Sequence, residues 1–166
     1  MNVTIYGGGN IGTQLATRFT EGKSKGLFSK VIVFTSKPEC FSNHLTIVDH
    51  QGNVVHQGEI DRATNNPNEA FADADLILVT VPSFMMESAS KTITPFSRPG
   101  LKISIIPGNG GGEVTFQQAI KRGATLFGLQ RVPRVARLVE YGKSVCATGY
   151  RSTLYAASLP RETTSV

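Results

Sequence analysis

The sequence of 166 residues has few charged side chains, few cysteines and no long apolar run. Charged residues make up 17% of the chain and hydrophobic residues 40%, a balance that excludes a disordered chain or a long coiled coil. The longest apolar runs, such as 76–79, fall far short of the roughly 20 residues that a membrane-spanning helix needs. The N-terminus lacks the charged segment and apolar core of a secretory signal. We therefore expect a soluble cytoplasmic domain without membrane contact.

Metal-binding patterns are also missing. The two cysteines, Cys40 and Cys146, are far apart, and the three histidines recur at intervals of six, which matches no ligand spacing. We therefore expect no metal site and free thiols in a reducing compartment. A chain of this length can bury enough apolar surface to fold without such staples.

The net charge is +5, and basic residues are concentrated between positions 121 and 151. No aromatic residues are interleaved with them as in nucleic-acid-binding motifs, so we expect no nucleic-acid partner. Two interpretations stay open: a solvated face with ion pairs, or a site for an anionic cofactor or substrate.

Apolar runs of strand length alternate with short helical patterns along the chain. This alternation predicts an α/β fold, a doubly wound and mostly parallel Rossmann-type sheet with helices on both faces. A β-hairpin is expected as an insertion at 45–57, and a C-terminal β-hairpin from 144–149 and 153–158. We expect the domain to span 1–160, followed by a polar tail at 161–166. The expected strands are 2–6, 31–34, 76–81, 102–107 and 125–129, and the expected helices start near 10, 68, 83 and 113.

A glycine-rich loop follows the first strand and opens the first helix, in the context that a dinucleotide-binding G-x-G-x-x-G motif requires. Gly7 allows the tight turn, Gly9 leaves room for a pyrophosphate, and Gly12 lets the helix pack close to the sheet. The helix N-terminus offers N–H groups and a positive dipole end to phosphates. The alternative is a merely tight turn. The predicted cofactor-binding residues of this loop are Gly7, Gly8, Gly9, Asn10, Ile11 and Gly12.

The end of the second strand indicates which dinucleotide binds. NAD sites usually place an acidic residue there for the adenosine ribose, whereas this chain has Thr35, Ser36 and Lys37. A hydroxyl and a cation favour a 2′-phosphate, so we predict that NADP(H) is preferred over NAD(H). The alternative is that Lys37 points to solvent.

Two further loops follow strands whose carboxyl ends should meet at the same edge of the sheet. Val81, Pro82 and Ser83 form one, and the glycine-rich segment 107–113, with Asn109, forms the other. We expect both to approach the cofactor. The alternative for the second is a flexible surface turn. The adjacent Met85 and Met86 are expected to fill the core, with contacts to the cofactor as the alternative.

The chain resembles the opine dehydrogenases of the octopine and nopaline type from residue 1 to about 160. The resemblance rests on the glycine loop, the segments 74–83 and 107–113 and, most specifically, the segment 131–143. It implies reductive condensation, in which an amino acid and a 2-oxo acid form an imine that is reduced by NAD(P)H. In this family a separate C-terminal helical domain supplies a His–Asp pair as general acid and base.

This chain departs from the family pattern because no histidine follows His56 and the sequence stops at Val166. We therefore expect no catalytic residue within it, an absent helical domain beyond the tail, and an isolated chain that is inactive. Exposed apolar surface would then favour a homodimer. Arg134 and Arg137 suit substrate carboxylates, with salt bridges or surface charge as the alternative. The remaining alternatives are a ketopantoate-reductase-like 2-oxo acid reductase and a non-catalytic cofactor-sensing module.

Overall fold

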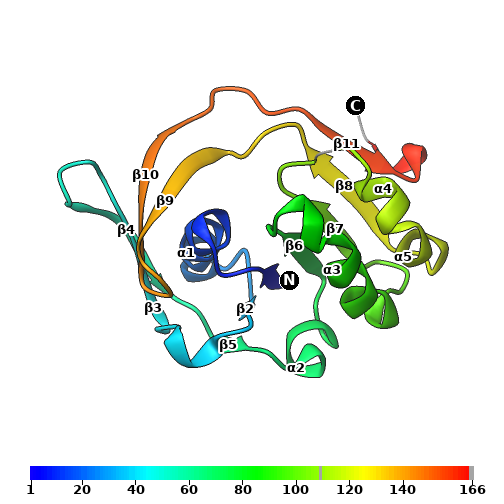
Figure 1. The fold of residues 1–166 in the computed structure, drawn as a ribbon, viewed down its shortest axis with the longest axis horizontal. Coiled ribbons are helices and arrows are strands. Elements are labelled where there is room, and N and C mark those ends of the chain that lie inside the picture. Colours follow the sequence, from blue (N-terminus) through cyan, green and yellow to red (C-terminus); the bar gives the residue numbers. More distant parts are fainter. Residues whose placement is uncertain (109, 165–166) are drawn as a thin grey trace.

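The computed structural model describes residues 1–108 and 110–164, which form two β-sheets packed around one long helix (Figure 1). The larger sheet contains β1 (Asn2–Tyr6), β2 (Lys30–Phe34), β5 (Arg62–Thr64), β6 (Leu76–Val79), β7 (Lys102–Ile105), β8 (Thr125–Leu129) and β11 (Ala156–Leu159). The smaller sheet contains β3 (His44–Val48), β4 (Val54–Glu59), β9 (Arg134–Glu140) and β10 (Ser144–Tyr150).

The larger sheet has the order β11-β8-β7-β6-β1-β2-β5, and its strands are parallel except for β11. The expected mostly parallel, Rossmann-type sheet is therefore confirmed. β1 pairs with both β2 and β6, and Tyr6 is in register with Phe34 and with Val79. β2 lies on one side of β1 and β6 on the other, so the chain leaves β1 and β6 in opposite directions. The carboxyl ends of β1, β2 and β6 therefore meet at one place, and ligands of open α/β sheets bind at such a place.

Helices cover both faces of the larger sheet, as expected. On one face lies α1 (Asn10–Ser24); on the other lie α2 (Pro67–Phe71), α3 (Met86–Ile93), α4 (Gly112–Thr115) and α5 (Gln117–Lys121) (Figure 1). Two apolar cores result, because each face of the parallel strands is covered. The single helix expected at 113–122 is divided at Phe116, which is fully buried in the core. Short 3₁₀ segments are η1 (Pro38–Cys40), η2 (Ser83–Met85), η3 (Thr94–Phe96) and η4 (Arg161–Thr163).

The smaller sheet, in the order β4-β3-β10-β9, covers the side of α1 that faces away from the larger sheet (Figure 1). The inserted hairpin is confirmed as β3 and β4. The buried side of α1 that it covers is polar. Thr17 and Thr20 donate their hydroxyls to the carbonyl oxygens of Thr13 and Thr17 at 2.9 and 2.6 Å, so these buried groups are satisfied within the helix.

The C-terminal hairpin is formed by different strands from those expected. β10 pairs antiparallel with β9, whereas β11 joins the edge of the larger sheet beside β8. The physical reason is that β9 turns Ala136 and Leu138 inward, where they pack with the apolar side chains of β3 and β10. The expected partner strands 144–149 and 153–158 therefore belong to different sheets.

Within residues 1–108 and 110–164, no helix is long and apolar enough to cross a membrane. The same part of the chain contains no group of His, Cys, Asp and Glu side chains that could hold a metal ion.

Candidate functional site

The glycine loop makes a tight bend between β1 and α1. Gly7 has φ of +116°, and a Cβ there would come within 2.8 Å of the Thr80 hydroxyl oxygen. A Cβ on Gly12 would lie 1.8 Å from the carbonyl oxygen of Gly7. Both positions therefore require glycine, the first for its backbone conformation and the second for the close approach of the helix.

Gly9 is different because its ideal Cβ would meet nothing within 4 Å. Gly9 is the N-cap of α1 and has an extended conformation that any residue could adopt. The missing side chain therefore leaves open space directly at the helix N-terminus. At Gly8 the space is filled, since a Cβ would approach ring carbons of Phe41 to 2.5 Å and the Tyr141 hydroxyl to 3.1 Å.

The N-terminus of α1 is electrostatically suited to an anion. No side chain caps it, and its first turn contains no acidic residue. The N–H groups and the positive dipole end of this 15-residue helix are thus available to phosphate oxygens. The open space at Gly9 and this uncapped helix end fit the pyrophosphate of a dinucleotide.

A cavity of about 530 Å³ lies beside this loop, within the size range of ligand pockets. It joins the carboxyl ends of β1, β2 and β6. Among the described residues, its lining includes no charged side chain. The lining residues are Tyr6, Gly7, Gly8, Gly9, Phe34, Thr35, Ser36, Asn65, Thr80, Val81, Pro82, Met85 and Tyr141.

The residues expected after β2 are placed unequally. Thr35 and Ser36 line the cavity, whereas Lys37 is exposed and is not part of its wall. The Thr35 hydroxyl lies 2.8 Å from the Tyr141 hydroxyl and accepts a hydrogen bond from the Lys37 backbone N–H at 3.3 Å. This end of β2 therefore presents hydroxyl groups and no carboxylate.

The residues expected after β6 are also divided. Val81 and Pro82 line the cavity, while Ser83 borders a separate pocket of about 110 Å³ next to 110–112. Asn109 lies outside the described residues. Met85 lines the cavity and is 38% exposed, so the expectation that it fills the core is wrong, whereas Met86 does pack against the core.

Asn10 and Ile11 do not direct their side chains into the cavity. The Asn10 Oδ1 accepts a hydrogen bond from the Leu138 backbone N–H at 2.7 Å, which fastens β9 to the start of α1. Ile11 packs against the core between α1 and the sheet. Any contact of these two residues with a phosphate would be made through their backbone N–H groups.

Arg134 and Arg137, the expected substrate contacts, lie outside the cavity. Arg134 is buried, and its Nε and Nη2 donate to the carbonyl oxygens of Thr148 and Ala147. Its guanidinium also lies 4.8 Å from the ring centroid of Tyr150. Arg137 is exposed and donates to the Ala136 carbonyl oxygen at 3.0 Å. Neither residue lines the cavity, because β9 follows the outer side of α1.

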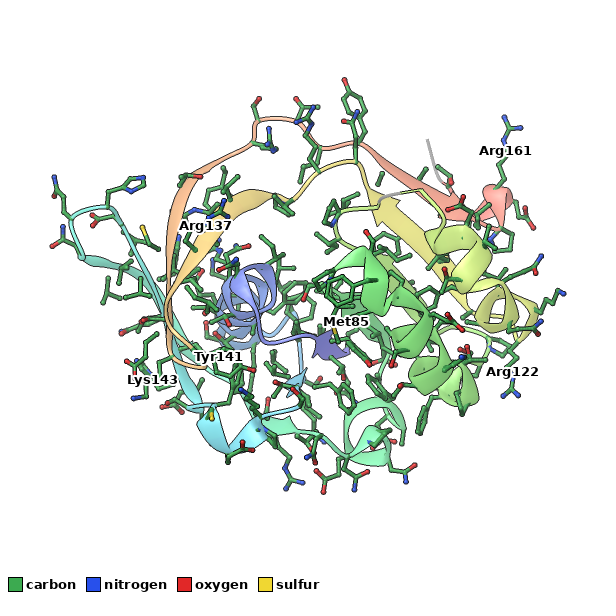
Figure 2. The ribbon with its side chains drawn as sticks, viewed as in Figure 1. Met85, Arg122, Arg137, Tyr141, Lys143 and Arg161 are labelled. Atoms are coloured by element: carbon green, nitrogen blue, oxygen red, sulfur yellow. The ribbon has the colours of Figure 1, made fainter. Side chains whose placement is uncertain are left out.

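Tyr141 is the main site residue that sequence reasoning missed. It lies in the turn after β9, and Figure 2 shows it near the glycine loop, with Met85 on the other side of the loop.

Asn65 was missed as well, since β5 before it has only three residues. Next to Asn65, Thr64 donates its hydroxyl to Glu69 at 2.7 Å. This bond and the one from Arg62 hold the pKa of Glu69 below its usual value.

Comparisons with known proteins agree with this geometry. A family model described as NAD-dependent glycerol-3-phosphate dehydrogenase N-terminus matches residues 2–108. An opine dehydrogenase of Haliotis discus hannai is 25% identical over 159 residues, which cover 87% of this chain and 39% of that protein. A structure of octopine dehydrogenase in complex with NADH and agmatine has a TM-score of 0.83 at 22% identity, covering 96% of this chain and 42% of that one. A yersinopine dehydrogenase with NADP⁺ bound has a TM-score of 0.74 at 15% identity, covering 95% and 41%.

The parallel sheet, the glycine loop at the meeting point of three strand ends and the adjoining cavity define a Rossmann-type dinucleotide-binding domain. The chain belongs to the family of NAD-dependent glycerol-3-phosphate dehydrogenase N-terminal domains. The resemblance to opine dehydrogenases is also confirmed, since the chain is similar to an opine dehydrogenase in sequence and to octopine dehydrogenase in fold. It spans about two fifths of the length of the opine-dehydrogenase relatives described above.

Proposed function

We propose that this chain is the NADP(H)-binding part of an opine-dehydrogenase-like oxidoreductase. The observation that carries the proposal is the open space at Gly9, directly at the uncapped N-terminus of α1. The pyrophosphate would lie there and accept hydrogen bonds from backbone N–H groups. The adenosine would lie towards Thr35 and Ser36, and the nicotinamide towards Val81 and Pro82.

The preference for the phosphorylated cofactor is supported by the end of β2. An NAD site would place a carboxylate there, where it would repel a 2′-phosphate. Here Ser36, Asn65 and Tyr141 line the cavity with neutral hydrogen-bonding groups. Lys37 is exposed one residue further on, within the same loop, and adds positive charge.

A pair of titrations tests the cofactor assignment. The chain contains no tryptophan, so the fluorescence of the reduced nicotinamide itself serves as the signal, with calorimetry as the second method. We expect saturable binding of both cofactors and tighter binding of NADPH. Equal or tighter binding of NADH would remove the NADP(H) preference, and no binding of either by a folded sample would remove the whole proposal.

The reaction that we propose is the reductive condensation of an amino acid with a 2-oxo acid, in a protein that contains this domain. When bound, the nicotinamide would supply the hydride, while this chain would hold and orient the cofactor. A proton donor must lie within about 2.6–3.2 Å of the reacting group. The described lining of the cavity contains no acidic or histidine side chain, so we expect little or no turnover from residues 1–166 alone.

Oxidation of NADPH by the longer protein tests the reaction. The assay uses a 2-oxo acid with and without amino acids. Turnover that requires both substrates supports reductive condensation, whereas turnover with the 2-oxo acid alone supports the ketopantoate-reductase-like alternative. Easily measured reductive amination by residues 1–166 alone would contradict our assignment of the proton donor to another part of the protein.

The compartment and the assembly are also proposals. The free cysteines Cys40 and Cys146 fit a reducing cytoplasm. Exposed apolar side chains, including Phe84 at 85% and Val114 at 73% exposed, favour a homodimer. A strictly monomeric species in sedimentation would contradict the dimer.

A further inference from the structure

The segment 131–143, which carries the most specific part of the family resemblance, reaches the cavity through one side chain. Its arginines are directed elsewhere, but Tyr141 in the turn after β9 lines the cavity. β10 pairs in parallel with β3, and this pairing brings a residue of the C-terminal third of the chain to the end of β2. Tyr141 is therefore in a position to contact the adenosine half of a cofactor.

Tyr141 is held firmly on the wall of the cavity. Its ring meets Phe41 edge-on, with centroids 5.5 Å apart at an angle of 85°. The next residue, Gly142, has φ of +71°, and a Cβ there would lie 2.3 Å from the Cys40 carbonyl oxygen. The Gly142 carbonyl oxygen accepts a hydrogen bond from the Ser42 N–H at 2.8 Å. The turn after β9 is thus fastened to the loop that contains η1.

The hydrogen bond between Tyr141 and Thr35 determines what the phenol can offer. The two hydroxyl oxygens are 2.8 Å apart, and Thr35 already accepts the Lys37 N–H. If Thr35 donates its proton to Tyr141, the phenol proton remains available for an acceptor in the cavity. A phosphate on the ribose 2′-oxygen, next to the end of β2, is such an acceptor, and a charged acceptor strengthens the bond.

We propose that Tyr141 is a specificity-determining residue that donates a hydrogen bond to the 2′-phosphate of NADP(H). The inference rests on the proposed function, because it requires the adenosine to lie at the end of β2. In NAD sites an acidic side chain at this strand end binds the adenosine ribose. Here a neutral donor from the smaller sheet, the Tyr141 hydroxyl, would bind the 2′-phosphate instead. Thr35 acts as a positioning residue for that donor.

The test compares the affinities of NADPH and NADH in the unsubstituted chain and in Tyr141→Phe. The substitution keeps the ring against Phe41 and removes the hydroxyl. We expect NADPH binding to weaken about tenfold or more, which is the effect of losing one hydrogen bond to a charged group. We expect NADH binding to weaken by less than about threefold, since its ribose has no charged acceptor. Adenosine 2′,5′-bisphosphate, used as a competitor, should lose affinity in parallel with NADPH.

Two further variants separate this role from a structural one. Tyr150→Phe is the matched control, because Tyr150 lies on β10 in the same sheet, is 51% exposed and does not line the cavity. It should leave both affinities unchanged. Thr35→Ser keeps the hydroxyl that positions Tyr141 and should retain the preference for NADPH.

The outcomes also separate this inference from the proposed function. If Tyr141→Phe weakens both cofactors equally, or weakens neither, Tyr141 does not determine specificity, although the binding domain stands. If the unsubstituted chain binds neither cofactor, both proposals are wrong. A selective loss of NADPH affinity, with Tyr150→Phe unchanged, supports the inference.

Discussion

Alanine at Gly9 should lower the cofactor affinity, whereas alanine at Gly12 should lower the stability, although the two positions belong to one motif. At Gly12 the new Cβ would lie 1.8 Å from the Gly7 carbonyl oxygen, a backbone atom that cannot move away without shifting β1 or α1. Alanine normally stabilises a helix interior by about 0.5–1 kcal/mol relative to glycine. Overpacking typically costs about 1–3 kcal/mol, so the steric term should dominate. We expect Gly12→Ala to lower the free energy of unfolding.

At Gly9 the Cβ would meet nothing within 4 Å, and the backbone conformation of φ −81° and ψ −163° suits alanine. Alanine is a poorer N-cap than glycine, but it also reduces the entropy of the unfolded chain. These terms oppose each other at about 0.5–1 kcal/mol each, so the stability should change by less than about 1 kcal/mol. The methyl group would, however, occupy the space proposed for the pyrophosphate. Losing one hydrogen bond to a phosphate should lower the cofactor affinity about 10- to 100-fold.

The assay measures both quantities for both variants. Urea unfolding followed by circular dichroism gives the stability, and titration with NADPH gives the affinity. Gly9→Ala should fold as the unsubstituted chain does and bind weakly, whereas Gly12→Ala should be less stable. A Gly9→Ala variant that binds NADPH as tightly as the unsubstituted chain would refute the argument that the missing side chain makes room for phosphate.

The remaining predictions concern contacts outside the cavity. Asn10→Ala removes the acceptor of the Leu138 N–H and should cost about 1–2 kcal/mol in urea unfolding, because it leaves that donor unpaired; an unchanged midpoint would contradict the proposed attachment of β9 to α1. Phe71→Ala removes a fully buried ring that lies among Tyr6, Phe34 and Phe96, and should cost about 3–5 kcal/mol by the same measurement. Burial raises the pKa of Asp61, but the hydrogen bonds from Lys23 and from the Val31 N–H lower it by more, so its pKa is below the ordinary value. The contribution of Asp61 to the free energy of unfolding should therefore be complete above its ordinary pKa of about 4. It should be lost as the pH falls through the lower pKa of the folded state. Asp61→Asn should cost about 1 kcal/mol at neutral pH and flatten the loss of stability in acid; an acid profile identical to that of the unsubstituted chain would contradict this.

Five strands of the larger sheet could be predicted from the sequence because their signals are local, whereas the three-residue β5 was not expected and β11 was expected in a hairpin with 144–149. β1, β2, β6 and β7 are short runs with consecutive buried residues, as parallel strands covered on both faces have, and β8 is a partly buried run of strand length beside them. The glycine loop could be predicted because its requirements are also local: a positive φ at Gly7 and a close approach at Gly12.

The packing of the smaller sheet on α1 could not be predicted, because the buried side chains of the helix on that side are polar. The hydroxyls of Thr17 and Thr20 donate to carbonyl oxygens of the same helix, which lets these polar side chains be buried. The sequence of the helix therefore shows one apolar stripe and gives no sign of the second buried side. β9 was not predicted for a similar reason, since the charged Arg134 interrupts the alternation of apolar and polar residues that is typical of a strand. Its buried guanidinium donates to the carbonyl oxygens of Thr148 and Ala147 instead of meeting solvent.

The site could be predicted where it follows the strands of the larger sheet and not where the smaller sheet contributes. Tyr141 and Thr35 are 106 positions apart in the sequence, and no local pattern connects them. They meet because β10 pairs with β3, a long-range pairing that also determines where the turn after β9 lies. Arg134 and Arg137 lie outside the cavity for the same reason, because the strand that carries them follows α1, and their expected contacts with a substrate carboxylate stay a prediction.

The measurement that tests the central claim most directly is calorimetric titration of residues 1–166 with NADPH, with circular dichroism to verify that the sample is folded. We expect saturable binding at one site, abolished or strongly weakened by Gly9→Ala without loss of folding. A folded sample that gives no saturable heat with NADPH or NADH would contradict it.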